Sequence, residues 1–462
     1  MLIRHGTCSQ AARGLFLPIL LPVALLVTLP AIGAPVINSQ TVSETALENG
    51  LRVIIKPERR WGVVSAGLVI KACPLYEAAD RQGLADLVRH MIHDVPAPGD
   101  DLSLSDWITD RGGAIRSYTT PDGTHVRVTT SANFFPEALA RTARATFEPS
   151  FREEIWANQL QTLRRRLMDA ESSPVGKLWR TMWETAFRQH PYGRPVSGTP
   201  DGIAAYDAED LAAYHREYFV PNNTALIVVG DVEADPTLDL VRELFGKYPR
   251  GTTALKEPDP EPIQTDTRTR LEKANTRNTL VSFGWHAAGI ANKPDVCALD
   301  LIYALLIEGQ QARLMQAFAS QEEIGAVPEV EFITKRDPGL FLVTCVTKPQ
   351  MELETRETIL AEIEKLHNTL LTPEELAGVK AVIRAGYSFD NATYENQVSS
   401  MGFYEAIDSY RFAIDYISTL EALTPEDVQR VARQYLGLEN YSLVIIRPKS
   451  ASGPVWEARL IQ

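Results

Sequence analysis

"AEDLAAYHREYFVPNNTALIVVGDV" (208–232) decides the fold, because a second version of it stands near the end of the chain. The later stretch is "PEDVQRVARQYLGLENYSLVIIRPK" (425–449), which begins 217 residues further on. The two stretches share identical residues at several matched positions, among them Glu209 and Glu426, Asp210 and Asp427, Tyr218 and Tyr435, and Asn223 and Asn440. We interpret them as two copies of one structural unit.

Each copy predicts a helix, a short turn and a buried strand. Acidic residues open the helix, where they interact favourably with the helix dipole. The apolar runs "ALIVV" (225–229) and "SLVII" (442–446) are rich in β-branched residues, which favour strands. The repeated unit is therefore a helix followed by a strand.

The same offset relates two earlier pairs of stretches. "VVSAG" (63–67) falls on "LVSFG" (280–284), and "GLADLVRH" (83–90) falls on "DLIYALLI" (300–307). Three matches in the same order at one offset indicate an internal duplication of the chain.

We predict two homologous halves, residues 45–250 and 268–450. Within each half, strand-like stretches alternate with long helical ones, a pattern typical of an α+β domain of sheet and helices. A linker, residues 251–267, joins the halves. This linker is rich in proline, threonine and charge, and it shows no hydrophobic periodicity.

The first 34 residues differ from the rest. Arg4 and Arg13 are their only formal charges, and an apolar run (15–34) ends in small residues. A basic start, an apolar middle and a small-residue exit predict a signal peptide over residues 1–34. A retained membrane anchor is the alternative, although prolines within the run would interrupt a spanning helix. We expect a secreted, periplasmic protein with no membrane span after signal removal.

Charge and cysteine content exclude several classes of protein. The formal net charge is −13, which argues against nonspecific binding to nucleic acid or to an anionic membrane surface. Only Cys73, Cys297 and Cys345 follow the signal segment, too few for a disulfide framework or a zinc cluster. We expect buried free thiols in strands, with one disulfide as the alternative.

Several stretches together resemble the insulinase-like M16 family of zinc metallopeptidases, in its shorter two-domain M16B form. They are "LENGLRVIIKPE" (47–58), "GLADLVRHM" (83–91), "HPYGRPVSGT" (190–199) and "DPGLFLV" (337–343), in this order. The resemblance implies the M16 fold, with two homologous halves facing each other as a clam-shell around a chamber. It also implies peptide substrates and pairing with a second chain.

The stretch that resembles the family's metal helix departs from the active pattern, His-x-x-Glu-His. Histidines at i and i+4 share a helix face and can both bind Zn²⁺, and the glutamate is the general base on the bound water. Here Asp86, Arg89 and His90 stand at these three positions, and Arg166 stands where a later helix should supply a glutamate ligand. An arginine cannot be deprotonated at ordinary pH, so it can be neither base nor ligand. We expect no zinc in this chain.

Two interpretations of this helix stay open. Asp86, His90 and His93 lie close enough along a helix to form a weak divalent-metal site. Alternatively, Asp86 pairs with Arg89 or Arg166, and the two arginines replace the metal's positive charge and hold the two helices together. We favour the second interpretation.

The second half lacks the family's other functional pair. The resemblance implies an arginine and a tyrosine seven residues apart, which hold the substrate backbone from across the chamber. In "RLMQAFASQEEIGAVPEV" (313–330), Ala319 and Ala326 stand at these positions. A shifted alignment would let Arg313 serve, but no tyrosine follows at the required spacing.

The sequence therefore predicts a noncatalytic M16-like subunit, a pseudopeptidase. Its expected partner is an active M16-like chain that carries the zinc, or a second copy of itself, and its expected ligands are peptides. One alternative is a standalone peptide-binding or scaffold protein. Another is a zinc-dependent endopeptidase with a displaced metal site.

Overall fold

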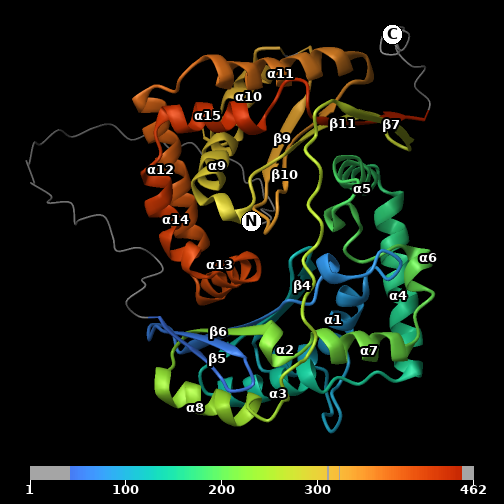
Figure 1. Cartoon of the computed structure of the whole chain (residues 1–462), viewed down its shortest axis with the longest axis vertical. Coiled ribbons are helices and arrows are strands. Elements are labelled where there is room, and N and C mark those ends of the chain that lie inside the picture. Colours follow the sequence, from blue (N-terminus) through green and yellow to red (C-terminus); the bar gives the residue numbers. More distant parts are fainter. Residues whose placement is uncertain (1–41, 310–311, 322, 450–462) are drawn as a thin grey trace, which may run out of the picture.

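A computed structural model describes residues 42–309, 312–321 and 323–449 of the chain. The expected signal peptide, residues 1–34, lies outside this described part. Two sheets with associated helices build the described chain, one from each predicted half (Figure 1). No described helix is long and apolar enough to cross a membrane.

The first half contains a sheet with the strand order β1-β2-β6-β3-β5-β4. Its strands are β1 (Ser43–Ala46), β2 (Arg52–Pro57), β3 (Val63–Ile70), β4 (Ala114–Thr120), β5 (Gly123–Ser131) and β6 (Thr224–Gly230). Its helices are α1 (Leu84–Asp94), α2 (Leu104–Asp110), α3 (Phe135–Phe147), α4 (Glu153–Ser172), α5 (Pro174–Ala186), α6 (Pro200–Ile203), α7 (Ala208–Tyr218) and α8 (Ala234–Phe245).

The second half contains a sheet with the strand order β7-β11-β8-β10-β9. Its strands are β7 (Arg268–Ala274), β8 (Thr279–His286), β9 (Val327–Phe332), β10 (Leu340–Thr347) and β11 (Ser442–Pro448). Its helices are α9 (Lys293–Ile307), α10 (Arg313–Ala319), α11 (Glu352–Asn368), α12 (Pro373–Asp390), α13 (Tyr394–Ile407), α14 (Arg411–Glu421) and α15 (Pro425–Tyr435).

The duplication predicted from the sequence is confirmed strand by strand. β2, β6, β3, β5 and β4 follow one another in the first sheet as β7, β11, β8, β10 and β9 do in the second. In both sheets the first of these pairs is parallel and the others are antiparallel. The α+β class and the two homologous halves are therefore as expected, and the linker between them contains no helix or strand.

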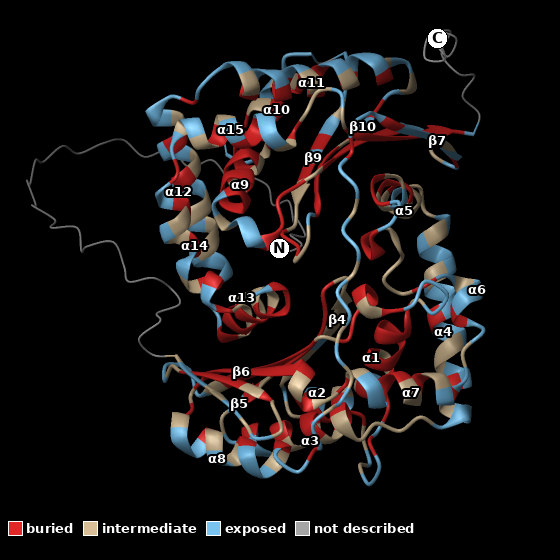
Figure 2. Ribbon diagram, in the orientation of Figure 1, coloured by how far each residue is buried: buried red, intermediate tan, exposed pale blue. Residues whose placement is uncertain are grey.

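Both faces of each sheet are buried, which explains the uninterrupted apolar runs of the central strands. Successive side chains of a strand point to opposite faces. In β6, Leu226 and Val228 join the core beneath α1, whereas Ile227 and Val229 join a second core on the other face. The central strands appear buried in Figure 2.

The second face of each sheet is covered by a helix from the opposite half. α13, from the second half, packs on β3, β5 and β6. α5, from the first half, packs on β7, β8 and β11. α5 and α13 occupy equivalent places in the two copies of the repeat, so the halves exchange one helix each (Figure 1).

Two glycines at equivalent positions allow these helices to approach the sheets. A Cβ atom on Gly67 of β3 would lie 2.6 Å from Val398 Cγ1 of α13. A Cβ atom on Gly284 of β8 would lie 2.7 Å from Met182 Sδ of α5 and 3.0 Å from Leu342 Cδ2. The same small residue therefore serves the same packing in both halves.

We expect Gly67→Ala to lower the free energy of unfolding by about 1–3 kcal/mol, as overpacking of a core does. Val398 is stiff at χ1 in a helix and cannot turn away. Gly284→Ala should cost less, because the flexible thioether of Met182 can move. Urea denaturation of both variants measures the difference. Adding Val398→Ala should restore stability to Gly67→Ala, and no rescue would contradict the proposed clash.

The three cysteines of the described residues are free and buried, as expected. Their predicted placement in strands is correct only for Cys345, which lies in β10. Cys297 lies in α9, and Cys73 stands before a short 3-10 helix at Pro74–Tyr76. An apolar helix buried all around gives the same local composition as a buried strand, so the sequence did not separate the two.

Candidate functional site

Helix α1 begins at a tightly constrained glycine. Gly83 has a φ of 93°, and a Cβ atom there would lie 2.7 Å from the Ser197 carbonyl oxygen. The carboxylate of Glu77 accepts hydrogen bonds from the backbone N–H groups of Gly83 and Ala85, both at 2.7 Å. Burial raises the pKa of Glu77 to about 7, although these two hydrogen bonds act in the opposite direction. The sequence analysis did not identify Glu77, whose six-residue distance from Gly83 gives no helical signal.

Asp86 and Arg89 form a buried ion pair on α1, and each residue is only 8% exposed. Arg89 Nε and Nη2 donate to Asp86 Oδ1 at 3.0 and 2.8 Å. The hydroxyl of Ser197 donates to Asp86 Oδ2 at 2.6 Å. Burial acts to raise the pKa of Asp86, but the ion pair with Arg89 and the Ser197 hydrogen bond outweigh it, so the pKa is lowered. The expected pairing of Asp86 with Arg89 is therefore present.

Arg89 also ties α1 to the sheet and to His90. Its Nη1 donates to the Ser117 hydroxyl of β4 at 2.9 Å. Its Nη2 lies 2.7 Å from His90 Nε2. A guanidinium is only a donor, so His90 Nε2 must accept this hydrogen bond through its lone pair. One of the two ring nitrogens of His90 that can bind a metal is thus occupied by an arginine.

The remaining polar groups of α1 pair with one another. His90 Nδ1 lies 3.4 Å from Asp94 Oδ2, and His93 Nδ1 lies 2.7 Å from Asp94 Oδ1. His90 Nε2 is 4.0 Å from Asp86 Oδ2. Within the described residues, no three His, Cys, Asp or Glu side chains could together hold a metal ion, so Asp86, His90 and His93 do not form such a group.

Arg166 does not take part in this cluster. It is exposed on α4, a helix that packs mainly against α5 and α6. The hypothesis that Arg166 helps to hold α4 and α1 together is therefore not supported. The physical reason is that the Asp86 carboxylate already accepts hydrogen bonds from Arg89 and Ser197. Arg166 would gain little from a further pairing and stays in contact with water.

The second-half positions carry no functional side chain. Ala319 is exposed at the last residue of α10, and Ala326 is half-buried between α10 and β9. Arg313, the alternative arginine, pairs with Glu375 of α12 at 2.7 Å. Among the described residues, no hydrogen bond or ion pair joins Ala319, Ala326 or Arg313 to Asp86 or Arg89.

A polar junction between the halves escaped the sequence analysis. The Tyr192 hydroxyl donates to Asp122 of the β4–β5 turn and accepts from the backbone N–H of Asp337, in the β9–β10 turn, at 3.2 Å. His190 Nε2 lies 3.4 Å from Asp337 Oδ2. "HPYG" and "DPG" lie in stretches that resemble the family, and nothing in the sequence shows that they meet. This junction fixes one half against the other.

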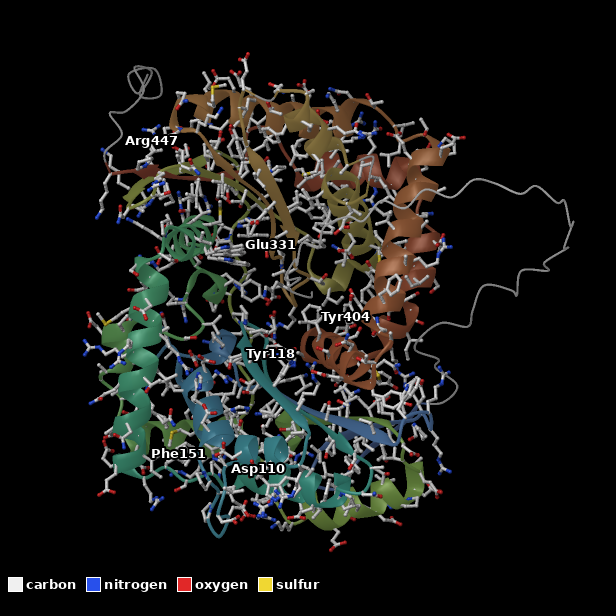
Figure 3. All side chains as sticks on the ribbon, turned by 180° about the vertical axis from the view of Figure 1, so that it is seen from behind. Asp110, Tyr118, Phe151, Glu331, Tyr404 and Arg447 are labelled. Atoms are coloured by element: carbon white, nitrogen blue, oxygen red, sulfur yellow. The ribbon has the colours of Figure 1, made fainter. Side chains whose placement is uncertain are left out.

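Lys335 lies at the same junction and is only 6% exposed. Its ammonium sits over the rings of Trp183 and Tyr192, at 5.8 and 6.0 Å from their centroids. Burial lowers the pKa of Lys335, while Asp122 and Glu331 act to raise it. Figure 3 shows Glu331 and Tyr118 lying where the two halves meet.

Two family profiles match the sequence. One, described as insulinase (peptidase family M16), matches residues 52–200. The other, described as peptidase M16 inactive domain, matches residues 205–383. Together the two matches cover well over half of the chain. The chain belongs to the peptidase M16 family.

The chain is similar over most of its length to proteins named as zinc proteases. The zinc protease PqqE of Helicobacter pylori is 24% identical over 409 residues, which are 87% of this chain and 92% of that protein. An uncharacterised zinc protease of Bacillus subtilis, YmxG, is 20% identical over 404 residues, 87% of this chain and 97% of that protein.

Solved structures show the same M16 fold. A protease from Helicobacter pylori gives a TM-score of 0.82 at 23% identity, covering 88% of this chain and 99% of that one. A peptidase M16 inactive domain from Pseudomonas fluorescens gives a TM-score of 0.78 at 17% identity, covering 89% of this chain and all of that one. The expected family and fold are therefore confirmed.

Two buried histidines should make the stability of this M16 chain dependent on pH. Burial lowers the pKa of His125 to about 3 and that of His215 to about 4. An unfolded histidine has a pKa of about 6.5, so the unfolded state takes up protons first. Stability should fall as pH decreases from about 6.5 towards 4, by about 1.4 kcal/mol per pH unit for each histidine.

Replacing His125 with phenylalanine should remove one of these two contributions. The aromatic ring keeps the stacking on Tyr118, whose ring centroid lies 4.6 Å away. We expect a shallower loss of stability between pH 6.5 and 5, measured by urea denaturation at several pH values. An unchanged slope would show that His125 is not the group that takes up the proton.

Proposed function

We propose that this chain is a noncatalytic M16 subunit that pairs with an active, zinc-bearing M16 chain. The observation that carries the proposal is the hydrogen bond between Arg89 and His90. It sets a permanent cation beside the one histidine that the family's metal-binding pattern retains here, and it uses a lone pair with which that histidine could bind zinc. No zinc-hydrolase step can be assigned to such an arrangement.

The proposed role is to form part of a peptide-processing chamber. The inner sheet faces of this chain are covered by its own α5 and α13. We therefore propose that the chamber forms between this chain and its partner, with peptides as ligands. Zinc would belong to the partner, and the chain would be exported to the periplasm through residues 1–34.

Coexpression tests the pairing. The chain should co-purify with an M16 homologue that carries an intact His-x-x-Glu-His motif, and peptide cleavage by the pair should exceed that of the homologue alone. A strict monomer that leaves the homologue's activity unchanged would end the subunit proposal. A peptide bound to the lone chain would instead favour a peptide-binding or scaffold protein.

Metal analysis tests the noncatalytic assignment separately. The purified chain should contain far less than one zinc per molecule, and chelators should not change its stability. Near-stoichiometric zinc that disappears in His90→Ala would contradict this assignment. Chelator-sensitive peptide cleavage by the lone chain would favour a displaced zinc site.

A further inference from the structure

The carboxyl end of α5 is held by the second half. The carbonyl oxygen of Ala186, at the end of α5, accepts hydrogen bonds from Arg268 Nη1 at 2.6 Å and from His286 Nε2 at 3.0 Å. A positive group near the last carbonyls of a helix also interacts favourably with the helix dipole. Because α5 belongs to the first half, these contacts fasten one half to the other.

Glu261 of the linker holds the residues that follow α5. Its carboxylate accepts hydrogen bonds from the backbone N–H groups of Arg188 at 3.0 and 3.1 Å, of Gln189 at 2.8 Å and of His190 at 3.0 Å. Successive N–H groups aimed at one point form an anion-binding nest. Arg268 Nη1 lies 3.5 Å from the same carboxylate, and the two side chains are 6% and 7% exposed.

The rest of the linker offers only weaker attachments. Glu257 pairs with Arg336 at 2.7 Å, but its side chain is 74% exposed, and such pairs contribute little. Gln264 is buried and accepts a hydrogen bond from Ser442 at 3.3 Å. Glu261 is therefore the charged linker residue whose side chain is nearly covered and is bonded to the first half.

The packing beneath α5 forms a small core of its own. Leu178 and Met182 of α5 pack there on Leu342, Val444 and Ile446 of the second sheet. The contact of α13 with the first sheet, in contrast, belongs to a core that continues into the second half. Of the two exchanged helices, α5 has the more separate core, so its attachment depends more on the polar anchors at its end.

We propose that Glu261 is a latch that keeps α5 docked on the second sheet. When the latch is released, the end of α5 and the loop that follows it leave this sheet, while α13 still joins the halves. The linker then does more than connect the two halves: through Glu261 it stabilises the contact of α5 with the second sheet. This inference does not depend on the presence of a partner chain.

Hydrogen–deuterium exchange of the full chain tests the latch. In Glu261→Ala, we expect amide exchange across α5 to rise by about tenfold or more, because charge-assisted hydrogen bonds are lost from a locally opening unit. Exchange in α13 should stay unchanged. Glu257→Ala is the matched control, since it removes an exposed linker carboxylate, and it should leave α5 unaffected.

A second, more conservative variant separates loss of the latch from general misfolding. Glu261→Gln keeps the shape of the side chain but turns an N–H donor towards backbone N–H groups, so it should raise α5 exchange to a smaller extent. Circular dichroism checks that both variants are folded. The latch is refuted if α5 exchange in both variants equals that of Glu257→Ala, even where the amides of residues 188–190 exchange faster.

Discussion

Replacing Asp86 with alanine should lower the free energy of unfolding by about 3–5 kcal/mol, the usual cost of breaking one side of a buried ion pair. The change leaves Arg89, a residue only 8% exposed, without its partner carboxylate. It also removes the acceptor of the Ser197 hydroxyl. Urea denaturation at pH 7 measures the loss.

The double variant Asp86→Ala with Arg89→Met separates charge from packing. Methionine fills a similar volume without a charge, so much of the lost stability should return. The two substitutions touch one network and are expected to be strongly nonadditive. A single-variant loss below about 1 kcal/mol, the range of exposed pairs, would show that the pair is not buried in solution. Such a result would also weaken the argument that an arginine replaces the metal.

The repeat made much of the fold predictable. A fixed offset between α7 and α15, and between the strands that follow them, already implies that both halves have one topology. Apolar runs with β-branched residues marked β6 and β11 correctly. These signals are local or repeated, so a single sequence carries them.

The helix exchange was not predictable in the same way. α5 and α13 show an apolar composition that fits burial, but the sequence does not state which sheet buries them. Gly67 gave no signal either, because a glycine in a strand has several explanations. Only the position of Val398, far along the chain, gives that glycine its reason.

The candidate site was predicted where its residues share one helix. Asp86 and Arg89 stand three positions apart, so their pairing follows from helical spacing. Arg166 was assigned from a family spacing, and there the prediction did not hold, because its side chain is exposed on α4. The junction around Tyr192 is formed by turns that lie far apart in the sequence. No repeat or periodic pattern in the sequence links these turns.

Separating the halves should prevent each from folding alone. A fragment of residues 42–250 would expose the face that α13 covers, including Ile54, Val69, Ile227 and Val229. Burying four such side chains stabilises by about 6–12 kcal/mol, at about 1.5–3 kcal/mol each. That is comparable to the whole stability of a typical domain, about 5–15 kcal/mol. We expect no cooperative unfolding transition for the fragment.

Coexpressing the two fragments provides the control. Residues 42–250 and 251–449 should assemble into a one-to-one complex, because each supplies the helix that covers the other's sheet. Size-exclusion chromatography and urea denaturation measure the assembly. A fragment of residues 42–250 that unfolds cooperatively at the full-length midpoint would show that α13 is dispensable. In that case the exchanged helices would join two independent domains, and the halves of this M16 chain would be free to move.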